Sequence, residues 1–516
     1  MPTDKPTGLA LALFLFAAPA WAEDPLSAID WLSQSVSQPA APAKTGPVEP
    51  PVSEGVTNGD VSVSVIGGPS QDAIGLLRPE VTGLPANLWG LGTTDGIASA
   101  IARERTTTLP ALRGLLMSVL LAEATPPADS KPGAKLLLAR IDKLLDLGAL
   151  DQARALLDAS GARSPDLFRR SFDVALLTGE EDRGCRIMVS SPGLAPTFPA
   201  RIFCLARSGD WNAAALTLRT AQALGYVTPE EDALLSRFLD PDLYEGDPAL
   251  TPPERVTPLA WRMFEAVGEP LPTATLPIAF AHAELRPQAG WKSQIEAAER
   301  LARAGAIAPN ALLGLYTERA PAASGGVWDR VAAFQRFESA LNGLERLDIE
   351  KTLPDLWSRL AEVELESPFA ELYGEPLNAL VLDGDARRIA FEAGLLSPAF
   401  ETVIKDHTPA TPREMFLTGI AKGDVAAIPA PDSLSRAIKP AFTGAALPDT
   451  LPADLQALLD DNRTGEAILS AIDRIESGVQ GNLVAVTEGL TLLRVVGQEK
   501  IARRTALELM LLERRG

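Results

Sequence analysis

The sequence predicts an all-α protein built of stacked helical hairpins, an α-solenoid. The main evidence is a pattern that occurs three times, as LGALDQA (residues 147–153), TGEEDRG (178–184) and SGDWNAA (208–214). The first glycines of these copies, Gly148, Gly179 and Gly209, lie 31 and 30 residues apart. The composition agrees, because only 5% of residues are aromatic while 43 prolines and 40 glycines break the chain often. Such a composition favours many short helices over a β-sheet.

Each copy is interpreted as the turn of one hairpin. A glycine ends the first helix because it adopts the left-handed backbone without strain. The acidic residues that follow are suited to cap the second helix, and the small residue five positions after the glycine lets the two helices approach closely. One hairpin cannot bury its apolar face alone, so repetition predicts stacking along an axis.

The turns at residues 148–153 and 209–214 resemble the central half of a tetratricopeptide repeat. In that family a glycine turn precedes an aromatic or aliphatic residue, and a small residue then follows in the second helix. The resemblance covers about residues 135–225. The spacing of 30 to 31 residues departs from the 34 that is typical of the family, and the other signature positions are not clearly filled. The resemblance implies a tetratricopeptide-like α-solenoid.

Residues 1–22 have the features of a signal peptide. Lys5 precedes an apolar run at residues 8–18, and Ala20-Trp21-Ala22 supplies a small-x-small cleavage site after Ala22. The run is too short to span a bilayer, which needs ~20 residues, although an uncleaved anchor is the alternative. No cysteine stands directly after the cleavage site, so a lipid anchor is not indicated, and no later stretch is long and apolar enough to cross a membrane. We therefore expect a periplasmic or secreted protein.

Residues 23–37 are predicted to form a short amphipathic helix. Its apolar face carries Leu26, Ile29, Leu32 and Val36, with Trp31 beside it. An isolated helix of this length is marginal in water, so it either folds back on the body or docks on another protein. Residues 38–59, rich in proline, alanine and glycine, are expected to be a disordered linker. Residues 60–92 are expected to be irregular, with one short β segment at 61–66.

The remaining chain divides at two proline-rich breaks. We predict an N-terminal helical-repeat unit at 93–240, a linker at 241–258, and a middle helical unit at 259–428. A second, Pro-rich linker at 429–452 then precedes a C-terminal helical unit at 453–516.

The two cysteines are predicted to form a disulfide. Cys185 falls one turn into the helix that follows Gly179, and Cys204 lies about one turn before the end of the helix that closes at Gly209. These helices should run antiparallel, which places both sulfurs at the same level. A loop of this length would stabilise the fold by ~3 kcal/mol. A redox or metal site is the alternative, but it has no CxxC motif and no nearby histidine.

No catalytic, cofactor or metal site is predicted. The two histidines, His282 and His407, have no nucleophile motif beside them and are expected to be a packed helix residue and a solvated loop residue. The glycine-rich loop 90–96 lacks the strand and lysine of a phosphate-binding loop, and its residues Thr93 to Asp95 are expected to cap a helix. Four carboxylates, Asp240, Asp242, Glu245 and Asp247, do not follow the EF-hand order, so Ca²⁺ binding is not expected.

The charge and the motifs together favour a binding protein. A net charge of −20 repels nucleic acid and makes a basic partner more plausible than an acidic one. The export signal, the repeat and the lack of catalytic motifs predict a helical-repeat scaffold that holds protein partners in a cell-envelope assembly. The alternative is a protein that binds or cleaves peptidoglycan with carboxylates that the sequence does not identify.

Overall fold

The computed structural model describes residues 70–161, 164–405 and 407–512. Throughout these ranges the elements are helices joined by turns, and the only β interaction is one isolated bridge between Leu77 and Ala122. The all-α prediction is confirmed. The signal peptide, the amphipathic helix with Leu26, Ile29, Trp31, Leu32 and Val36, the linker at 38–59 and the β segment at 61–66 lie outside the described residues.

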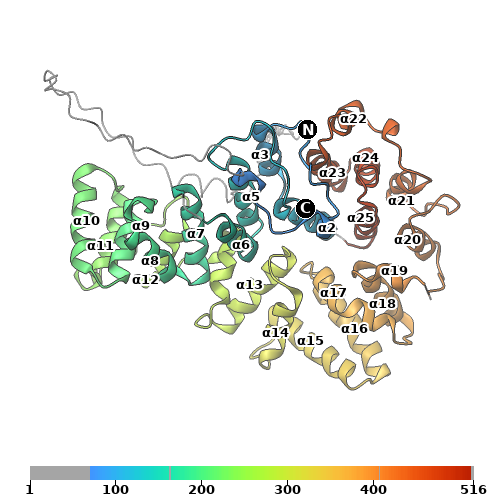
Figure 1. Cartoon of the computed structure of the whole chain (residues 1–516). Coiled ribbons are helices and arrows are strands. Elements are labelled where there is room, and N and C mark those ends of the chain that lie inside the picture. Colours follow the sequence, from blue (N-terminus) through green and yellow to red (C-terminus); the bar gives the residue numbers. More distant parts are fainter. Residues whose placement is uncertain (1–69, 162–163, 406, 513–516) are drawn as a thin grey trace, which may run out of the picture.

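The described chain begins with a group of helices that occupies the centre of the molecule (Figure 1). These elements are η1 (Gln71–Ala73), α2 (Pro79–Thr82), α3 (Thr94–Arg103), α4 (Pro110–Leu121) and α5 (Lys135–Asp146). The start of α3 is capped as predicted, because the Thr93 hydroxyl accepts a hydrogen bond from the Gly96 N–H at 3.2 Å.

An extended group of helices, here called the arm, leads away from α5 and forms one side of the molecule in Figure 1. Each helix of the arm packs against the next one along the chain. The elements are α6 (Leu150–Ser160), α7 (Pro165–Thr178), α8 (Glu181–Ser190), η2 (Pro192–Leu194), α9 (Phe198–Arg207), α10 (Trp211–Leu224), α11 (Pro229–Leu239), η3 (Pro241–Tyr244) and α12 (Pro258–Ala266).

The three glycine turns lie where the sequence predicts them. Gly148, Gly179 and Gly209 separate α5 from α6, α7 from α8 and α9 from α10, with φ of 71°, 79° and 85°. At the fifth position of the middle copy, a Cβ on Gly184 would come within 2.6 Å of the Phe172 ring, so the small residue permits the close approach. Acidic capping occurs in one copy, where the Asp210 carboxylate accepts from the Ala213 N–H at 3.1 Å.

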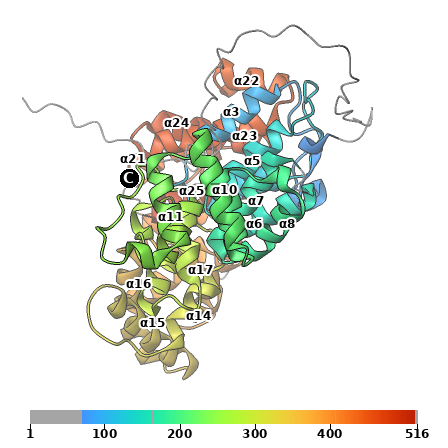
Figure 2. The ribbon, with the colours of Figure 1, turned by 90° about the vertical axis from the view of Figure 1, so that its left-hand side faces the viewer.

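The chain then forms a middle group of helices with its own core. Its elements are η4 (Thr273–Thr275), η5 (Ile278–Leu285), α13 (Trp291–Arg303), α14 (Pro309–Glu318), α15 (Val327–Asn342), α16 (Arg346–Ala361), α17 (Glu366–Asn378), α18 (Gly384–Leu396), α19 (Phe400–Val403) and α20 (Pro412–Lys422). Helices α13 to α17 lie below the central group in Figures 1 and 2. Aromatic rings of Phe334, Phe337, Phe369 and Tyr373 pack against one another in this core.

The last group returns to the centre of the molecule. It comprises α21 (Ser433–Ile438), η6 (Lys439–Phe442), η7 (Pro448–Thr450), α22 (Ala453–Asp460), α23 (Thr464–Val479), α24 (Leu483–Val495) and α25 (Glu499–Leu511). The segment 429–452, expected to be a linker, therefore contains short helices. Because Ile438 and Phe442 are fully buried, this segment is part of the packed body.

The first and last groups of helices share one hydrophobic core. Helix α23 packs against α3 and α4, and α25 packs against α4. Figures 1 and 2 both show α23 beside α3, although these helices are far apart in the sequence. We call this contact of α23 and α25 with α3 and α4 the closure.

Buried carboxylates from the last helices hold the start of α4 in the closure. The Ala111 N–H donates to both carboxylate oxygens of Glu508, at 3.0 and 2.9 Å. The Thr108 hydroxyl and the Leu109 N–H donate to Glu476. Helix α4 has no side-chain cap of its own, so acids from α23 and α25 satisfy its free N–H groups and oppose its dipole.

The glycine-rich loop 90–96 makes a close approach to the same closure. A Cβ on Gly90 would lie 2.2 Å from the Asn462 carbonyl oxygen, and a Cβ on Gly465 would lie 2.5 Å from the Trp89 ring. The Gly465 N–H also donates to the Leu88 carbonyl at 2.7 Å. These glycines therefore allow two backbone segments to meet, which explains the glycines without a bound phosphate.

Candidate functional site

The two cysteines are paired in the structure, as the hairpin arrangement predicts. Cys185 on α8 and Cys204 on α9 are bonded, with their Cα atoms 4.9 Å apart. Both residues are buried in the core of the arm beside Phe203 and Met188. The bond joins the second helix of one hairpin to the first helix of the next.

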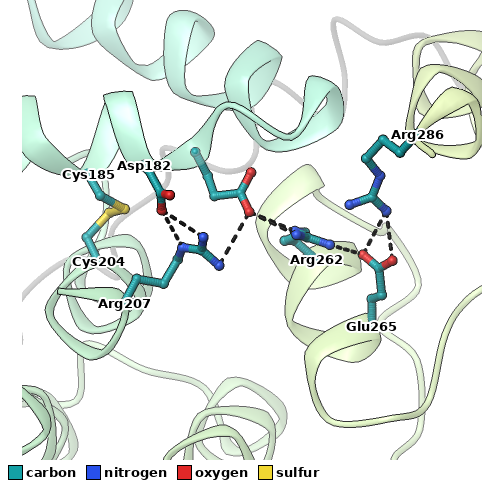
Figure 3. Close-up of polar contacts among 8 residues, drawn as sticks. Asp182, Cys185, Cys204, Arg207, Arg262, Glu265 and Arg286 are labelled. Atoms are coloured by element: carbon teal, nitrogen blue, oxygen red, sulfur yellow. Dashed lines mark hydrogen bonds and ion pairs between the residues drawn. A yellow bond between two sulfur atoms is a disulfide. The ribbon is translucent and has the colours of Figure 1, made fainter. Parts of the chain in front are cut away.

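A chain of alternating charges begins next to this disulfide (Figure 3). Arg207 on α9 donates to Asp182 at 2.9 and 2.7 Å and lies 3.4 Å from Glu181, both at the start of α8. Arg262 on α12 donates to Glu181 at 2.9 Å and also pairs with Glu265. We call this chain, which continues to Arg286, the ion-pair relay.

The relay ends on the middle group of helices. Arg286, directly after η5, donates to both oxygens of Glu265 at 2.7 and 2.9 Å, and its guanidinium lies 5.3 Å from the Trp261 ring centroid. The side chain of Glu181 is only 3% exposed and lies against two arginines, Arg207 and Arg262. The relay therefore fixes α12 and η5 to the first turn of α8.

A small cavity lies on the other side of α12. Residues of α7, α9, α11 and α12 line a space of about 80 Å³, with Asp173 at its wall. Burial raises the pKa of Asp173 to about 7, against the opposing effect of Arg169 and Arg170. Asp173 is therefore partly protonated at neutral pH, which is the protonation behaviour of an acid catalyst.

The size of this cavity limits its chemistry. About 80 Å³ accommodates a few water molecules and no polymer strand. Helix α12 also fills the space between α7 and α11, and its Met263 and Phe264 pack into the core of the arm. Asp173 thus has the pKa of an acid catalyst without room for a polysaccharide substrate.

The structure places the two histidines in different environments. The His282 ring lies 2.7 Å from the Gly148 carbonyl, at the first hairpin turn, and burial lowers its pKa. His407 was expected to be solvated, and that expectation is wrong. Its ring stacks on Phe391 with centroids 3.6 Å apart and its Nε2 lies 3.0 Å from Glu414. This packing could not be predicted from sequence, because His407 lies in the connection between α19 and α20 whereas Phe391 lies on α18.

The four acidic residues of the first break lie on the surface. Asp240, Asp242, Glu245 and Asp247 are exposed in and around η3. Within residues 70–161, 164–405 and 407–512, no three histidine, cysteine or acidic side chains are grouped so as to hold a metal ion. In the same ranges, no helix combines the length and the apolar character that crossing a bilayer would need.

The functional groups that the structure brings together were missed at the level of sequence. Glu181 lies in the second copy of the repeated turn, where its acidic residues were expected only to cap a helix, and no motif links it to Asp173 or Arg262. The one available signal for Asp173 was its spacing from Arg169 and Arg170, four and three residues earlier in the same helix, which places an acid beside two arginines. A comparison with known protein families, curated proteins and solved structures finds no match for this chain.

Proposed function

We propose that the protein is an exported, periplasmic helical-repeat scaffold that binds other proteins in a cell-envelope assembly, and that the arm is its binding element. The features that support export are the signal peptide expected at residues 1–22 and the disulfide, which persists in oxidising compartments.

The observation that carries the proposal is the outer face of α10. This helix turns Ala214, Leu218 and Ala221 toward its neighbours α9 and α11. The helix also exposes large apolar side chains along its length, with Trp211, Leu216 and Leu224 at 52, 67 and 54% exposure, although the Trp211 ring, at the start of the helix, also contacts Phe238 of α11. Exposed apolar groups that include tryptophan are typical of protein-binding surfaces.

Elsewhere on the arm, Ile187 and Val189 are exposed at the end of α8. Because the chain carries a net charge of −20, a partner that combines an apolar groove with a basic rim would be attracted and oriented.

Site-specific crosslinking in living cells tests the proposal. A photo-crosslinking amino acid at Leu216 is expected to capture a protein, whereas the same amino acid at Lys351, exposed on α16, is not. The double variant Trp211→Ser/Leu216→Ser should lose co-purification of that protein while keeping its helical circular dichroism. Equal capture from both positions, or none from either, would contradict the proposal.

Export and the cell-wall alternative need separate measurements. Mass spectrometry of the mature protein from the periplasmic fraction should give an N-terminus at Glu23. Co-sedimentation with purified peptidoglycan, in the absence of any crosslinked protein, would instead favour the alternative. If the protein is found only in the cytoplasm with residues 1–22 still present, both the envelope scaffold and the peptidoglycan alternative are excluded.

A further inference from the structure

A second cavity, of about 370 Å³, lies where three distant parts of the chain meet. Its wall comes from the connection between α3 and α4 together with the start of α4, from the C-terminal end of α13, and from the C-terminal end of α23. Ile278 of η5 and Glu364, between α16 and α17, also line it. We call this space the arginine cavity.

The charge of the arginine cavity is opposite to that of the protein. Arg105, Arg113, Arg300 and Arg303 line it, against two carboxylates, Glu364 and Glu476. Four positive and two negative groups leave a formal charge of +2, whereas the whole chain carries −20. A local excess of arginine on so acidic a protein concentrates anions at this one place.

Two of the arginines are held in place by the backbone. Arg300 donates to the carbonyls of Thr273 and Leu276 at 3.0 and 3.2 Å. Arg113 is buried and donates to the Arg303 carbonyl at 2.5 Å. Burial, followed by the nearby charge of Arg303, lowers the pKa of Arg300. The wall therefore contains positive charge that a bound anion would stabilise.

The other two arginines are exposed at the rim. Arg303 forms no ion pair within the described part of the chain, and Arg105 faces the side-chain amide of Gln480. The hydroxyl of Thr107, on the same connection as Arg105, lies on the wall beside them. By contrast, one oxygen of Glu476, Oε1, already accepts hydrogen bonds from Thr108 and Leu109.

We propose that the arginine cavity binds a small organic oxyanion, a molecule that carries phosphate or carboxylate groups. Guanidinium groups bind these oxyanions in a bidentate, charge-assisted manner. A volume of about 370 Å³ falls within the range of small-molecule sites and exceeds what one inorganic phosphate fills. Hydroxyl groups of threonine provide further donors for the organic part of the ligand.

The position of the cavity gives the ligand a structural effect. An anion held by Arg105, Arg303 and Arg300 would connect the α3–α4 segment with α13, directly beside the closure. A ligand that binds only the folded chain stabilises it by mass action. Binding is therefore expected to raise the melting temperature as well as to release heat.

Isothermal titration calorimetry of the full-length protein at low ionic strength tests the proposal. The probes are citrate, glycerol phosphate and inorganic phosphate, with glycerol as the neutral control. We expect citrate or glycerol phosphate to bind with one-to-one stoichiometry and more tightly than inorganic phosphate, and glycerol not to bind. Binding of inorganic phosphate as tight as that of both organic anions would overturn the assignment of an organic ligand.

Matched double variants locate the binding. Arg105→Gln/Arg303→Gln should weaken binding by at least roughly tenfold, since two charge-assisted contacts are lost. Arg201→Gln/Arg219→Gln removes two exposed arginines from the arm, makes the same change in net charge and should bind as the unmodified protein does. Circular dichroism and melting curves verify that both variants are folded.

Three outcomes would overturn the proposal. The first is that no anion binds the unmodified protein at millimolar concentration. The second is that both double variants lose affinity equally, because binding then follows net charge and not the cavity. The third is binding of several anions per chain that about 150 mM salt abolishes, which is the behaviour of screened surface charges.

Discussion

Replacing Glu104 by glutamine should stabilise the protein at alkaline pH and leave it unchanged at acidic pH. Glu104 follows the last turn of α3 and is only 4% exposed. Lys143 donates to the backbone carbonyls of Ala102 and Glu104, at 3.0 and 2.8 Å, and so contributes only its charge to the Glu104 carboxyl group. The pKa of Glu104 is raised to about 9. Burial is the main cause, and the nearby carboxylate of Asp473 on α23 adds to it, with a larger effect than the opposing charge of Lys143.

The sign of the effect follows from proton binding in the two states. Below about pH 4.5 the folded and unfolded chains both hold this proton, so the group does not affect stability. Between pH 4.5 and 9 the folded chain keeps the proton and the unfolded chain releases it, which lowers the free energy of unfolding by about 1.4 kcal/mol per pH unit. At about pH 8 the loss reaches at most about 5 kcal/mol. Glutamine cannot ionise and therefore removes this loss.

Urea denaturation followed by circular dichroism, at about pH 5, 6.5 and 8, measures the effect. The difference in free energy of unfolding between Glu104→Gln and the unmodified protein should rise from near zero to several kcal/mol over this range. Glu254→Gln, at an exposed position before α12, serves as the control and should give no pH-dependent difference. Parallel pH profiles for Glu104→Gln and the unmodified protein would refute the reasoning.

Three further predictions concern stability and can be checked by the same urea denaturation. Gly465→Ala should destabilise by about 1–3 kcal/mol, because its Cβ would overlap Trp89, whereas Gly114→Ala on the open face of α4 should stabilise by up to about 1 kcal/mol. Equal changes in the free energy of unfolding for Gly465→Ala and Gly114→Ala would contradict the close approach of Gly465 to Trp89. Cys185→Ala/Cys204→Ala should lose about 3 kcal/mol, and a reducing agent should remove the same amount from the unmodified protein but nothing from the variant. Glu181→Ala should lose about 3–5 kcal/mol because it removes the buried partner that Arg262 and Arg207 share, and adding Arg262→Met should recover part of that loss; a purely additive double variant would show that Glu181 and Arg262 are not coupled.

Sequence could predict the features that depend on nearby residues. The hairpin turns follow from glycine, whose preference for a left-handed backbone is a local property, and Gly148, Gly179 and Gly209 all adopt it. The disulfide follows from the same turns, because the pairing of Cys185 with Cys204 needs only the order and direction of two consecutive helices. The helix cap at Thr93 is equally local.

The features that sequence could not predict join residues far apart in the chain. No periodic pattern links Ala111 to Glu508, or Glu181 to Arg262, and each of these contacts depends on how whole helices are placed. The glycine loop illustrates the difference. Its cap could be predicted from Thr93, whereas the need for Gly90 arises only because the backbone at Asn462 lies against it.

The two linkers were predicted from prolines, and the outcome shows what proline does and does not specify. Pro440 and Pro448 lie in the first two residues of short 3₁₀ turns in the segment 429–452, whereas Pro354 and Pro376 lie inside α16 and α17. Proline does not indicate exposure either. Ile438 and Phe442 are buried in that segment, because apolar side chains between the breaks still find a place in the core.

The closure has a consequence for the order in which the chain can fold. The N–H groups at the start of α4 are satisfied by Glu476 and Glu508, which are synthesised about 370 to 400 residues later. An emerging chain thus holds an incomplete first core, with Trp89 and Leu112 lacking the partners supplied by α23 and α25, until those two helices have been synthesised. Removing the last turns of α25, with Glu508, should therefore destabilise α4 and the core around it before it destabilises the arm.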